Sequence, residues 1–470
     1  MTSDQVAWLA PALSAFVQPF RVGFPKVTGF RHLTTYMLGL LSDLPRKSIE
    51  PIALAAGTAP RTLQEFLADY PWDDARLQRM LLRQIADRPA PAPGKGVSGG
   101  GGGGGGIGVI DESAHAKRGP KTPGAQRQYC GESGKIDNCV VGVHLVYTDN
   151  AAGNPFSCAI GSDLYLPQSW MENPALRAEA RVPEQVTFRP KWRIALDLLG
   201  EALGQGVKMQ YVTFDEEYGK VPAFWRQLDA LGQKAIGEVP RNFLCWATLP
   251  KYRSPQKPFA AHRVDDLAGR SPVFRNQQWQ TLRVKDTTRG AMVWKVRSAR
   301  VRIPDAPGGR PSERSSWLIV AYRQHRGGGS ETKYFFSNAP AGEDLLSLLQ
   351  AAFARWHVEK WFERGKQESG LGDFEVRTYR SLMRHWLIAR LTMLFLTQAT
   401  TRLRGEKSGD HFRAGGRLLP AVAGEDAGSL VAFLGGDDPA LPLPPASQSG
   451  QLQESEGTDI ERRFNVALSC

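Results

Sequence analysis

The chain has 470 residues, enough for about two to four domains and for at least one sizeable buried core. Hydrophobic residues make up 41% and charged residues 23%, which is ordinary for a soluble globular protein. Lys and Arg number 59 against 47 Asp and Glu, and the net charge of +12 favours a nucleic acid as partner, although basic proteins also use such charge for solubility alone.

Cysteine spacing and hydropathy exclude several classes of protein. The five cysteines are widely spaced and include no Cys-x-x-Cys pair, so the sequence indicates neither a zinc site nor a disulfide framework. Residues 1–24 lack the basic start and the uninterrupted apolar core of a secretory signal. The longest apolar stretch, residues 386–396, contains Arg390 and is too short to span a bilayer. We therefore expect a soluble cytoplasmic protein with no membrane partner.

Residues 1–87 are predicted to form an all-helical N-terminal domain. Within it, residues 48–67 have the pattern of a helix-turn-helix, in which an apolar helix ends at Gly57 and a second helix begins near Arg61. A helix-turn-helix would place Arg61 on DNA, whereas a plain helical hairpin would only pack against its neighbours. The sequence leaves both interpretations open.

Residues 88–106 form a linker by composition, with alternating Pro and Ala followed by a run of eight glycines. A glycine run loses too much backbone entropy on folding to carry a defined structure. We assign this segment no function.

From residue 107 the sequence alternates predicted strands and helices. The strands are expected at residues 107–110, 139–147, 156–166, 211–214 and 235–239. One helix, with apolar positions from Ile194 to Ala202, precedes the fourth strand, and another, begun by Pro222, precedes the fifth. Three strands, helix, strand, helix, strand is the order of an RNase H-like α/β core, which we assign to residues 107–239.

The sequence then becomes rich in β-formers, and we interpret residues 240–340 as an insertion. Its strands are expected at residues 281–285, 292–303, 317–323 and 333–337. A long helix is predicted from about Glu343 to about Glu368, and residues 341–404 would complete the core with helices. The tail, residues 405–470, is rich in Gly, Pro and Ser, which is typical of poorly ordered segments.

Two acidic residues follow predicted strands directly. Asp111 ends the first strand in the sequence VIDE, and Asp215 ends the fourth in VTFDEEYG. In an open α/β sheet, ligands bind in the crevice beyond the strand ends. Each aspartate alone is more simply a solvated loop starter. Metal-dependent phosphodiester chemistry, however, needs several carboxylates that converge on hard cations, and these two are candidates.

A third acidic residue lies in the helical sequence RWHVEKWFERGK. Arg355, Glu359 and Lys366 are spaced so that they project from nearly the same face of one helix. Apolar residues from Leu345 to Trp356 lead into that face, so it borders the core. The pattern fits an ion-pair ladder, and it also fits a metal ligand between two cations that bind phosphates.

These motifs resemble those of DDE-type insertion-sequence transposases, a group that includes DDE superfamily endonucleases. The spacing of Arg355, Glu359 and Lys366 is similar to the signature around the family's last acidic residue. The segments VIDESAHAKRG and RQYCGESGK resemble its first motif, and DEEYG with VPRNF resembles its second. The resemblance covers about residues 25–400, and Ala352 stands where the family often has a tyrosine.

The resemblance implies a DNA transposase that acts as a metal-dependent endonuclease. Asp111, Asp215 and Glu359 are implied as catalytic residues and as ligands of two Mg²⁺ ions, which Mn²⁺ can replace. Water would cut one strand, and the freed 3′-OH would attack the opposite or target strand, while Arg355 and Lys366 bind phosphates. The implied partners are double-stranded DNA, at transposon ends and target, and a second copy of the chain in a homodimer on DNA. The protein would be associated with the nucleoid of a bacterium.

Other polar residues near these motifs are given different roles. In related transposases an insertion of this kind helps to hold transposon-end DNA, so Lys295 and Arg297 would be DNA contacts, or else part of an ordinary solvated face. Glu112 is excluded from the site because successive strand residues point to opposite faces. His115 and His357 are expected to be structural or close to DNA, because Mg²⁺ prefers oxygen ligands.

Two alternatives stay open. One is a transposase-derived DNA-binding protein that has lost its chemistry, against which the presence of all three carboxylates argues. The other is a different RNase H-like enzyme, such as a resolvase or a nuclease of RNA–DNA hybrids. The helix-turn-helix pattern and the insertion favour transposition, because cleavage of a hybrid needs neither.

Overall fold

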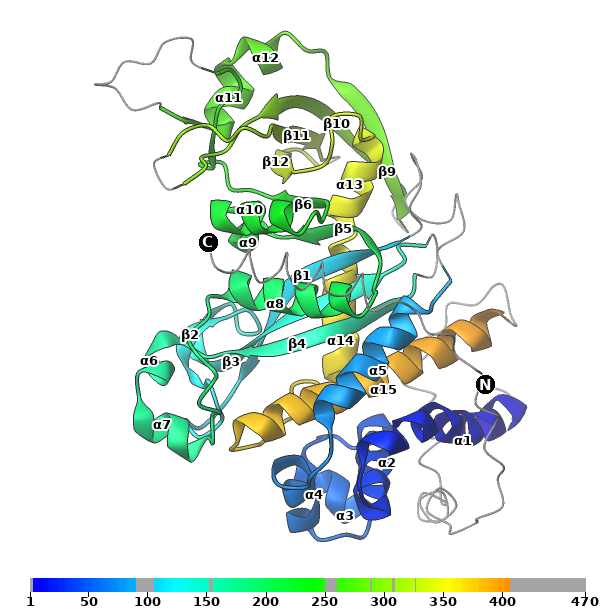
Figure 1. Ribbon diagram of the computed structural model, residues 1–470. Coiled ribbons are helices and arrows are strands. Elements are labelled where there is room, and N and C mark those ends of the chain that lie inside the picture. Colours follow the sequence, from blue (N-terminus) through cyan, green and yellow to red (C-terminus); the bar gives the residue numbers. More distant parts are fainter. Residues whose placement is uncertain are drawn as a thin grey trace, which may run out of the picture.

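The computed structural model of the protein describes residues 3–89, 105–151, 155–249, 260–287, 290–306, 309–325 and 327–405. Its centre is a mixed β-sheet with helices on both faces (Figure 1). The α/β class expected from the sequence is therefore confirmed. Most of the predicted linker at 88–106 and nearly all of the predicted tail at 405–470, with Cys470, lie outside the described residues.

The N-terminal part of the chain is helical, as the sequence predicts. Its helices are α1 (Ser3–Val17), the 3₁₀ helix η1 (Gln18–Gly23), α2 (Val27–Leu41), α3 (Ile49–Ala55), α4 (Pro60–Ala68) and α5 (Asp74–Ala86). The pair α3 and α4 corresponds to the predicted helix-turn-helix, and Gly57 in the turn between them has a φ of 64°, a conformation that favours glycine. Contact of this pair with DNA stays a prediction.

Six strands form the first half of the sheet. They are β1 (Gly106–Ala116), β2 (Gln126–Cys130), β3 (Lys135–Thr148), β4 (Ser157–Tyr165), β5 (Met209–Phe214) and β6 (Ala235–Glu238). All five predicted strands are present, and β2 is an addition that pairs with the first residues of β3. The pairs β4–β3, β3–β1, β1–β5 and β5–β6 give the spatial order β4-β3-β1-β5-β6. β3 is antiparallel to β1 and β4, whereas β5 and β6 run parallel to β1.

The strands of the predicted insertion continue this sheet. They are β9 (Gln280–Thr287), β10 (Gly290–Val301), β11 (Ser316–Gln324) and β12 (Ser330–Ser337). β12 pairs with β6 over only three residues, from Phe335 to Ser337, and β11, β10 and β9 follow as an antiparallel meander. The elements between β6 and β9 are β7 (Leu244–Cys245), β8 (His262–Arg263), α11 (Val264–Arg270) and α12 (Pro272–Arg275).

Helices cover both faces of the sheet (Figure 1). The helices between β4 and β6 are α6 (Gln168–Met171), α7 (Pro174–Glu179), α8 (Lys191–Gly204), α9 (Glu216–Gly219) and α10 (Pro222–Ala230). α8 packs on β3 and β4 through a buried side that includes Ile194 and Leu198, as its apolar pattern predicts. On the opposite face, α13 (Leu345–Phe353) packs on β5 and β6, and α14 (Trp356–Glu368) packs on β1 and β4.

The prediction of one continuous helix from about Glu343 to about Glu368 is wrong. The helix is interrupted at Ala354 and Arg355, where the amides of His357 and Val358 bond to carbonyls only three residues back, at 2.9 and 3.0 Å. This tighter turn separates two docking surfaces: Phe353 packs on Trp294 and Phe335 of the insertion, whereas Arg355 points to β1. No proline or glycine marks the break, so the sequence pattern does not show it.

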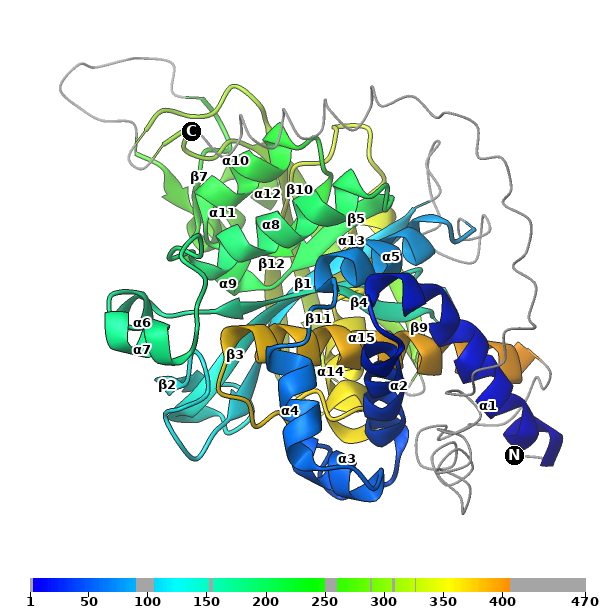
Figure 2. The same cartoon turned by 60° about the horizontal axis from the view of Figure 1, so that its bottom comes forward.

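The last described helix, α15 (Tyr379–Gly405), packs on β4 and carries the N-terminal helices on its other side (Figure 2). Its Arg384 is fully buried. The guanidinium donates to the main-chain carbonyls that end α4 and follow it, at Phe66, Leu67, Tyr70 and Trp72. None of the helices in the described ranges is long and apolar enough to cross a membrane.

Candidate active site

Asp111 lies within β1, whereas the sequence predicts that the strand ends there. β1 continues to Ala116 because β3 pairs with it along this whole stretch. The parallel pairing with β5, however, stops at Val109, opposite Thr213. Asp111 therefore lies on an edge of β1 that β5 no longer covers, and its side chain is 13% exposed.

Asp215 directly follows β5, as predicted. The register aligns Val109 with Thr213, and each aspartate comes two residues later, so both aspartates lie at the same level of the sheet. One carboxylate oxygen of Asp215 accepts a hydrogen bond from the amide of Glu217 at 3.0 Å. Asp215 is thus also the N-cap of α9.

Arg355 connects the first and the third predicted carboxylates. Its Nη1 lies 3.1 Å from Oδ2 of Asp111, and its Nη2 lies 3.0 Å from Oε1 of Glu359. Arg355 is the N-cap residue of α14, and Glu359 lies in the first turn of that helix. The Glu359 side chain is 53% exposed, so this side of the cluster is open to solvent. The structure therefore brings Asp111, Glu359 and Arg355 together.

The electrostatics link Asp215 to the same cluster. Burial and, to a smaller extent, the charge of Asp215 raise the pKa of Asp111 to about 7, although Arg355 acts in the opposite direction. Burial also raises the pKa of Asp215, again against the effect of Arg355. Burial lowers the pKa of Arg355, but the charges of Asp111, Glu359 and Asp215 outweigh it and raise that pKa overall. One guanidinium thus interacts electrostatically with all three carboxylates.

The sequence analysis did not single out Tyr218, which is buried beside the aspartates. Burial raises the pKa of its hydroxyl, and the charges of Glu112, Asp111 and Asp215 raise it further. Among the described residues that hydroxyl has no hydrogen-bond partner. The neighbouring Gly219 has to be glycine, because a Cβ there would lie 1.9 Å from a main-chain carbonyl oxygen of β6. The signal for Tyr218 was its place in the DEEYG motif.

Glu112 is only partly excluded from the site. Its side chain points away from Asp111 and forms an ion pair with Lys191 of α8 at 2.8 Å, as the alternation along a strand predicts. Its charge nevertheless raises the pKa of both Asp215 and Tyr218. Glu112 therefore contributes to the negative field of the cluster from the opposite face.

The predicted DNA-binding cations lie in different places. Lys366 is on α14, and its Nζ donates to the carbonyl of Ala114 on β1 at 3.1 Å. Arg61 is exposed on α4. Lys295 is exposed on β10, and Arg297 on the same strand lies over the Trp279 ring at 4.4 Å. Among the described residues, no hydrogen bond or ion pair connects Arg61, Lys295 or Arg297 to the carboxylates, and their contact with DNA stays a prediction.

Of the two histidines near the motifs, His115 is buried and His357 is partly buried, and both are hydrogen-bonded within the protein. His115 Nε2 lies 2.8 Å from the hydroxyl of Ser113, and His357 Nε2 lies 3.0 Å from the amide oxygen of Asn150. Burial lowers the pKa of His357 to about 4 and that of His115 well below its usual value. Both contacts fit the structural role expected from the sequence.

The carboxylate oxygens at this site suit a hard cation, although they are not arranged as a complete set of metal ligands in this structure. No group of three or more His, Cys, Asp or Glu side chains in the described ranges is placed to hold a metal ion. The positively charged guanidinium of Arg355 lies between the carboxylates of Asp111 and Glu359. Carboxylate oxygens are the ligands that Mg²⁺ prefers.

Comparison with known proteins shows which family the chain belongs to. The sequence model of the family described as DDE superfamily endonuclease matches residues 19–291, more than half of the chain. The chain belongs to this family. The matched range contains Asp111 and Asp215 and ends before Glu359, so the place of Glu359 in the site rests on its contact with Arg355 and on the sequence motif.

Two similar proteins are transposases. A Microchaete diplosiphon protein described as a probable transposase for insertion sequence element IS701 is 28% identical over 233 residues, which are 48% of this chain and 53% of that protein. The chain thus spans about half the length of this curated relative. A cryo-EM structure of the piggyBac transposase synaptic complex with hairpin DNA aligns with 97% of this chain and 86% of that chain, at 10% identity and a TM-score of 0.39. So low a score carries no argument about this chain.

Proposed function

We propose that this DDE superfamily endonuclease is a DNA transposase that cuts strands at transposon ends and joins them to target DNA. The observation that carries the proposal is the placement of Asp111 and Glu359 on the two arms of Arg355, with Asp215 at the same level of the sheet. Membership of the family and the description of the IS701 relative support it.

We further propose that the sheet is an RNase H-like core. The order β4-β3-β1-β5-β6, with three antiparallel strands followed by two parallel ones, supports this assignment. Helix α8 connects β4 to β5, and α10 connects β5 to β6, as the alternation in the sequence predicts. Residues 240–340 would be an insertion that lengthens the sheet before the helix that carries Glu359.

Asp111, Asp215 and Glu359 would hold two Mg²⁺ ions, for which Mn²⁺ can substitute. Such ions activate the attacking oxygen and stabilise the leaving oxygen of a phosphodiester. A cation at these carboxylates requires Arg355 to give up part of its contact with Asp111 or Glu359, since both need the same oxygens. The guanidinium would then be free to bind a phosphate of the DNA.

Several residues of the chain would keep the carboxylates charged and in place for these cations. Burial and mutual repulsion favour the protonated form of Asp111, and Arg355 counteracts this effect. Lys366 ties α14 to β1 through the carbonyl of Ala114, which fixes Glu359 next to the sheet edge. The Tyr218 hydroxyl, which is buried and has no hydrogen-bond partner among the described residues, would orient a carboxylate or a water.

Double-stranded DNA would be the substrate, at the transposon ends and at the target. We propose a homodimer on DNA and association with the bacterial nucleoid, in agreement with the net charge of +12. An inactive DNA-binding descendant of a transposase would bind the same DNA without cutting it. The intact cluster of carboxylates gives no support to that alternative.

The test is Mg²⁺-dependent cleavage of duplexes taken from the DNA that flanks the gene. The full chain should nick them with Mg²⁺ and not with EDTA, and Glu359→Gln should abolish nicking because it removes a ligand charge. Glu363→Gln is the matched control, since Glu363 lies one turn further along α14 and pairs with Lys360 at 2.5 Å. Equal nicking by Glu359→Gln and the control would contradict the proposal.

A further inference from the structure

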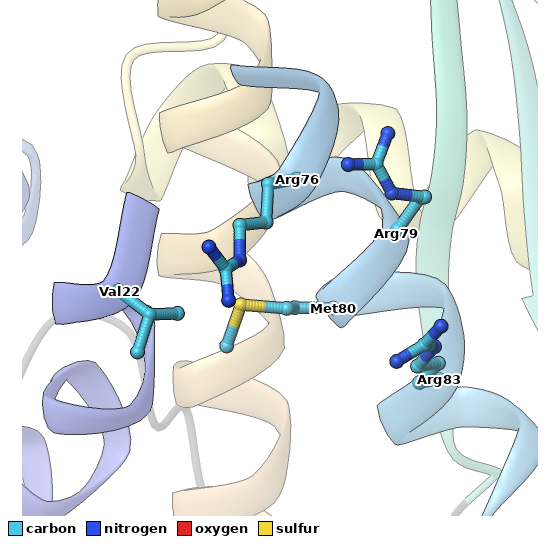
Figure 3. Close-up of a pocket in the computed structure, with 5 residues that line it drawn as sticks. All are labelled: Val22, Arg76, Arg79, Met80 and Arg83. Carbon is cyan, nitrogen blue, oxygen red and sulfur yellow. The ribbon is translucent and has the colours of Figure 1, made fainter. Parts of the chain in front are cut away.

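Helix α5 carries three arginines on its exposed side. Arg76, Arg79 and Arg83 are exposed, whereas Leu77 and Leu81 on the other side are fully buried. Figure 3 shows the three arginine side chains leaving successive turns of the helix, with Val22 of η1 across from Arg76. They line a surface hollow of about 390 Å³, together with Val22 and Met80.

The orientation of α5 keeps these arginines away from the sheet. Gln78 lies on the opposite side of the helix and donates to the carbonyl of Ile160, on the edge strand β4, at 2.9 Å. Arg390 of α15 donates to the same carbonyl and to the Gln78 side chain. α5 is thus fastened to β4 through one face, and its arginine face stays open.

The arginine face has little internal neutralisation. Arg79 Nη2 lies 3.9 Å from Oδ2 of Asp73, at the limit of an ion pair. The charge of Arg79 also acts to lower the pKa of Glu201, which burial raises. No ion pair of Arg76 or Arg83 occurs within the described residues. Three guanidinium groups line this hollow, and Asp73 is their one ion-pair partner within the described residues, so they have N–H donors available for an anion.

The spacing suits an extended polyanion better than a small one. At a rise of about 1.5 Å per residue, the helix separates Arg76 from Arg83 by about 10 Å along its axis. This distance corresponds to about three phosphates along one strand of a duplex, at about 3.4 Å each. Positions i, i+3 and i+7 keep the three side chains within one side of the helix.

We infer that the arginine face of α5, formed by Arg76, Arg79 and Arg83, binds the phosphate backbone of double-stranded DNA. The inference rests on the proposed function, which supplies duplex DNA as the partner, and it assigns a contact outside the carboxylate cluster. Arginine is suited to this contact because its fork of N–H donors matches phosphate oxygens. The contact is independent of base sequence, because only phosphates are reached.

The test measures how DNA binding depends on salt. The full chain and a variant with Arg76→Gln, Arg79→Gln and Arg83→Gln are titrated against a fluorescent duplex of random sequence in EDTA, at several salt concentrations. The slope of log K against log salt is negative, and each lost phosphate contact reduces its magnitude by about 0.9. We therefore expect the magnitude of the slope to fall by about 2 to 3 units in the triple variant. The single substitution Arg83→Glu, at an exposed position, should weaken DNA binding as well.

A matched control removes the same amount of charge elsewhere. Arg46, Arg181 and Lys121 are exposed and paired with Glu375, Asp69 and Glu179. Their triple replacement by Gln should change the slope by less than about one unit. An unchanged slope in the α5 variant, or an equal fall in the control, would overturn the inference.

This outcome is separable from that of the proposed function. If the α5 variant shows the expected fall in salt dependence but the wild type never cleaves DNA, the α5 contact is supported and the transposase proposal is refuted. If the wild type cleaves DNA with Mg²⁺ but the α5 variant binds DNA as the wild type does, the transposase proposal is supported and the α5 contact is refuted.

Discussion

Arg355 holds two carboxylates that a metal ion would also need. Its side chain is 30% exposed and pairs with Asp111 and Glu359 at 3.1 and 3.0 Å. Without the guanidinium, the repulsion between Asp111 and Asp215 has no close counter-charge. A divalent cation then has no competitor for the oxygens of Asp111 and Glu359.

Arg355→Gln should therefore change how Mg²⁺ affects stability. In EDTA the variant should be less stable than the wild type by about 1–2 kcal/mol, because the largely buried Asp111 loses a partner that is itself partly screened by solvent. Saturating Mg²⁺ should raise the melting temperature of the variant by more than that of the wild type. Differential scanning calorimetry with and without the ion measures both effects.

The control for this experiment is Arg364→Gln, which removes an arginine of the same helix that pairs with Glu368 at 3.1 Å. It should respond to Mg²⁺ as the wild type does. If Mg²⁺ shifts the melting temperature of all three proteins equally, Arg355 does not compete with a cation at the carboxylates.

At the scale of elements, α15 is the helix that joins the N-terminal part to the sheet. Next to the buried Arg384, His385 connects two other elements through its ring. Its Nε2 donates to the carbonyl of Gly370, after α14, at 3.1 Å, and its Nδ1 accepts from the Tyr36 hydroxyl of α2 at 2.9 Å. These contacts need the neutral ring, and burial together with the Lys117 charge lowers the pKa of His385 to about 4.

The stability that His385 provides should depend on pH. Its pKa is lower in the folded protein than the ordinary value of about 6.5, so its contribution is present above pH 6.5 and is lost as the pH falls towards 4. The difference in unfolding free energy between the wild type and His385→Gln should shrink by roughly 1.4 kcal/mol per pH unit in that window. Urea unfolding at a series of pH values measures it.

Replacement of the exposed His262 by Gln serves as the comparison, because it removes an imidazole that is not buried. Its stability should follow the pH profile of the wild type. A constant difference between the wild type and His385→Gln from pH 7 to pH 4 would mean that the buried ring is not held neutral by the contacts described.

The elements with regular patterns could be predicted from the sequence, and those set by tertiary contacts could not. β-branched and aromatic runs identified β3, β4 and the four strands of the insertion, and apolar spacing identified α8. The extension of β1 to Ala116 depends on pairing with β3, and the short junction of β12 with β6 depends on three residues. Neither leaves a periodic signal in the local sequence.

The candidate site was predictable to a similar extent. Motif spacing selected Asp111, Asp215 and Glu359, and the strand order placed the first two at one level. The spacing of Arg355 and Glu359 on a helix also predicted that they share a face. It did not reveal that Arg355 turns to Asp111, because that contact depends on the break between α13 and α14. Burial of Tyr218 likewise follows only from the packing of α9 against β6.

At the scale of the whole molecule, basic and acidic groups have separate places. The net charge of +12 is carried in part by the arginine face of α5, which stays open beside the edge of the sheet. The acidic residues Asp111, Asp215 and Glu359 lie together around a single arginine between the sheet and α14. This separation fits a protein that attracts DNA over a broad surface and reacts with it at one acidic point.

The most direct test of the central claim is Asp215→Asn. Asparagine is as good an N-cap as aspartate, so α9 keeps its cap, while the charge that a cation needs is lost. We expect unchanged thermal unfolding, retained or tighter binding to duplexes from the DNA flanking the gene, and no Mg²⁺-dependent cleavage. Asp229→Asn, at a partly buried aspartate that pairs with Arg314 at 3.1 Å, should cleave as the wild type does. Cleavage by Asp215→Asn at the wild-type rate would contradict the account.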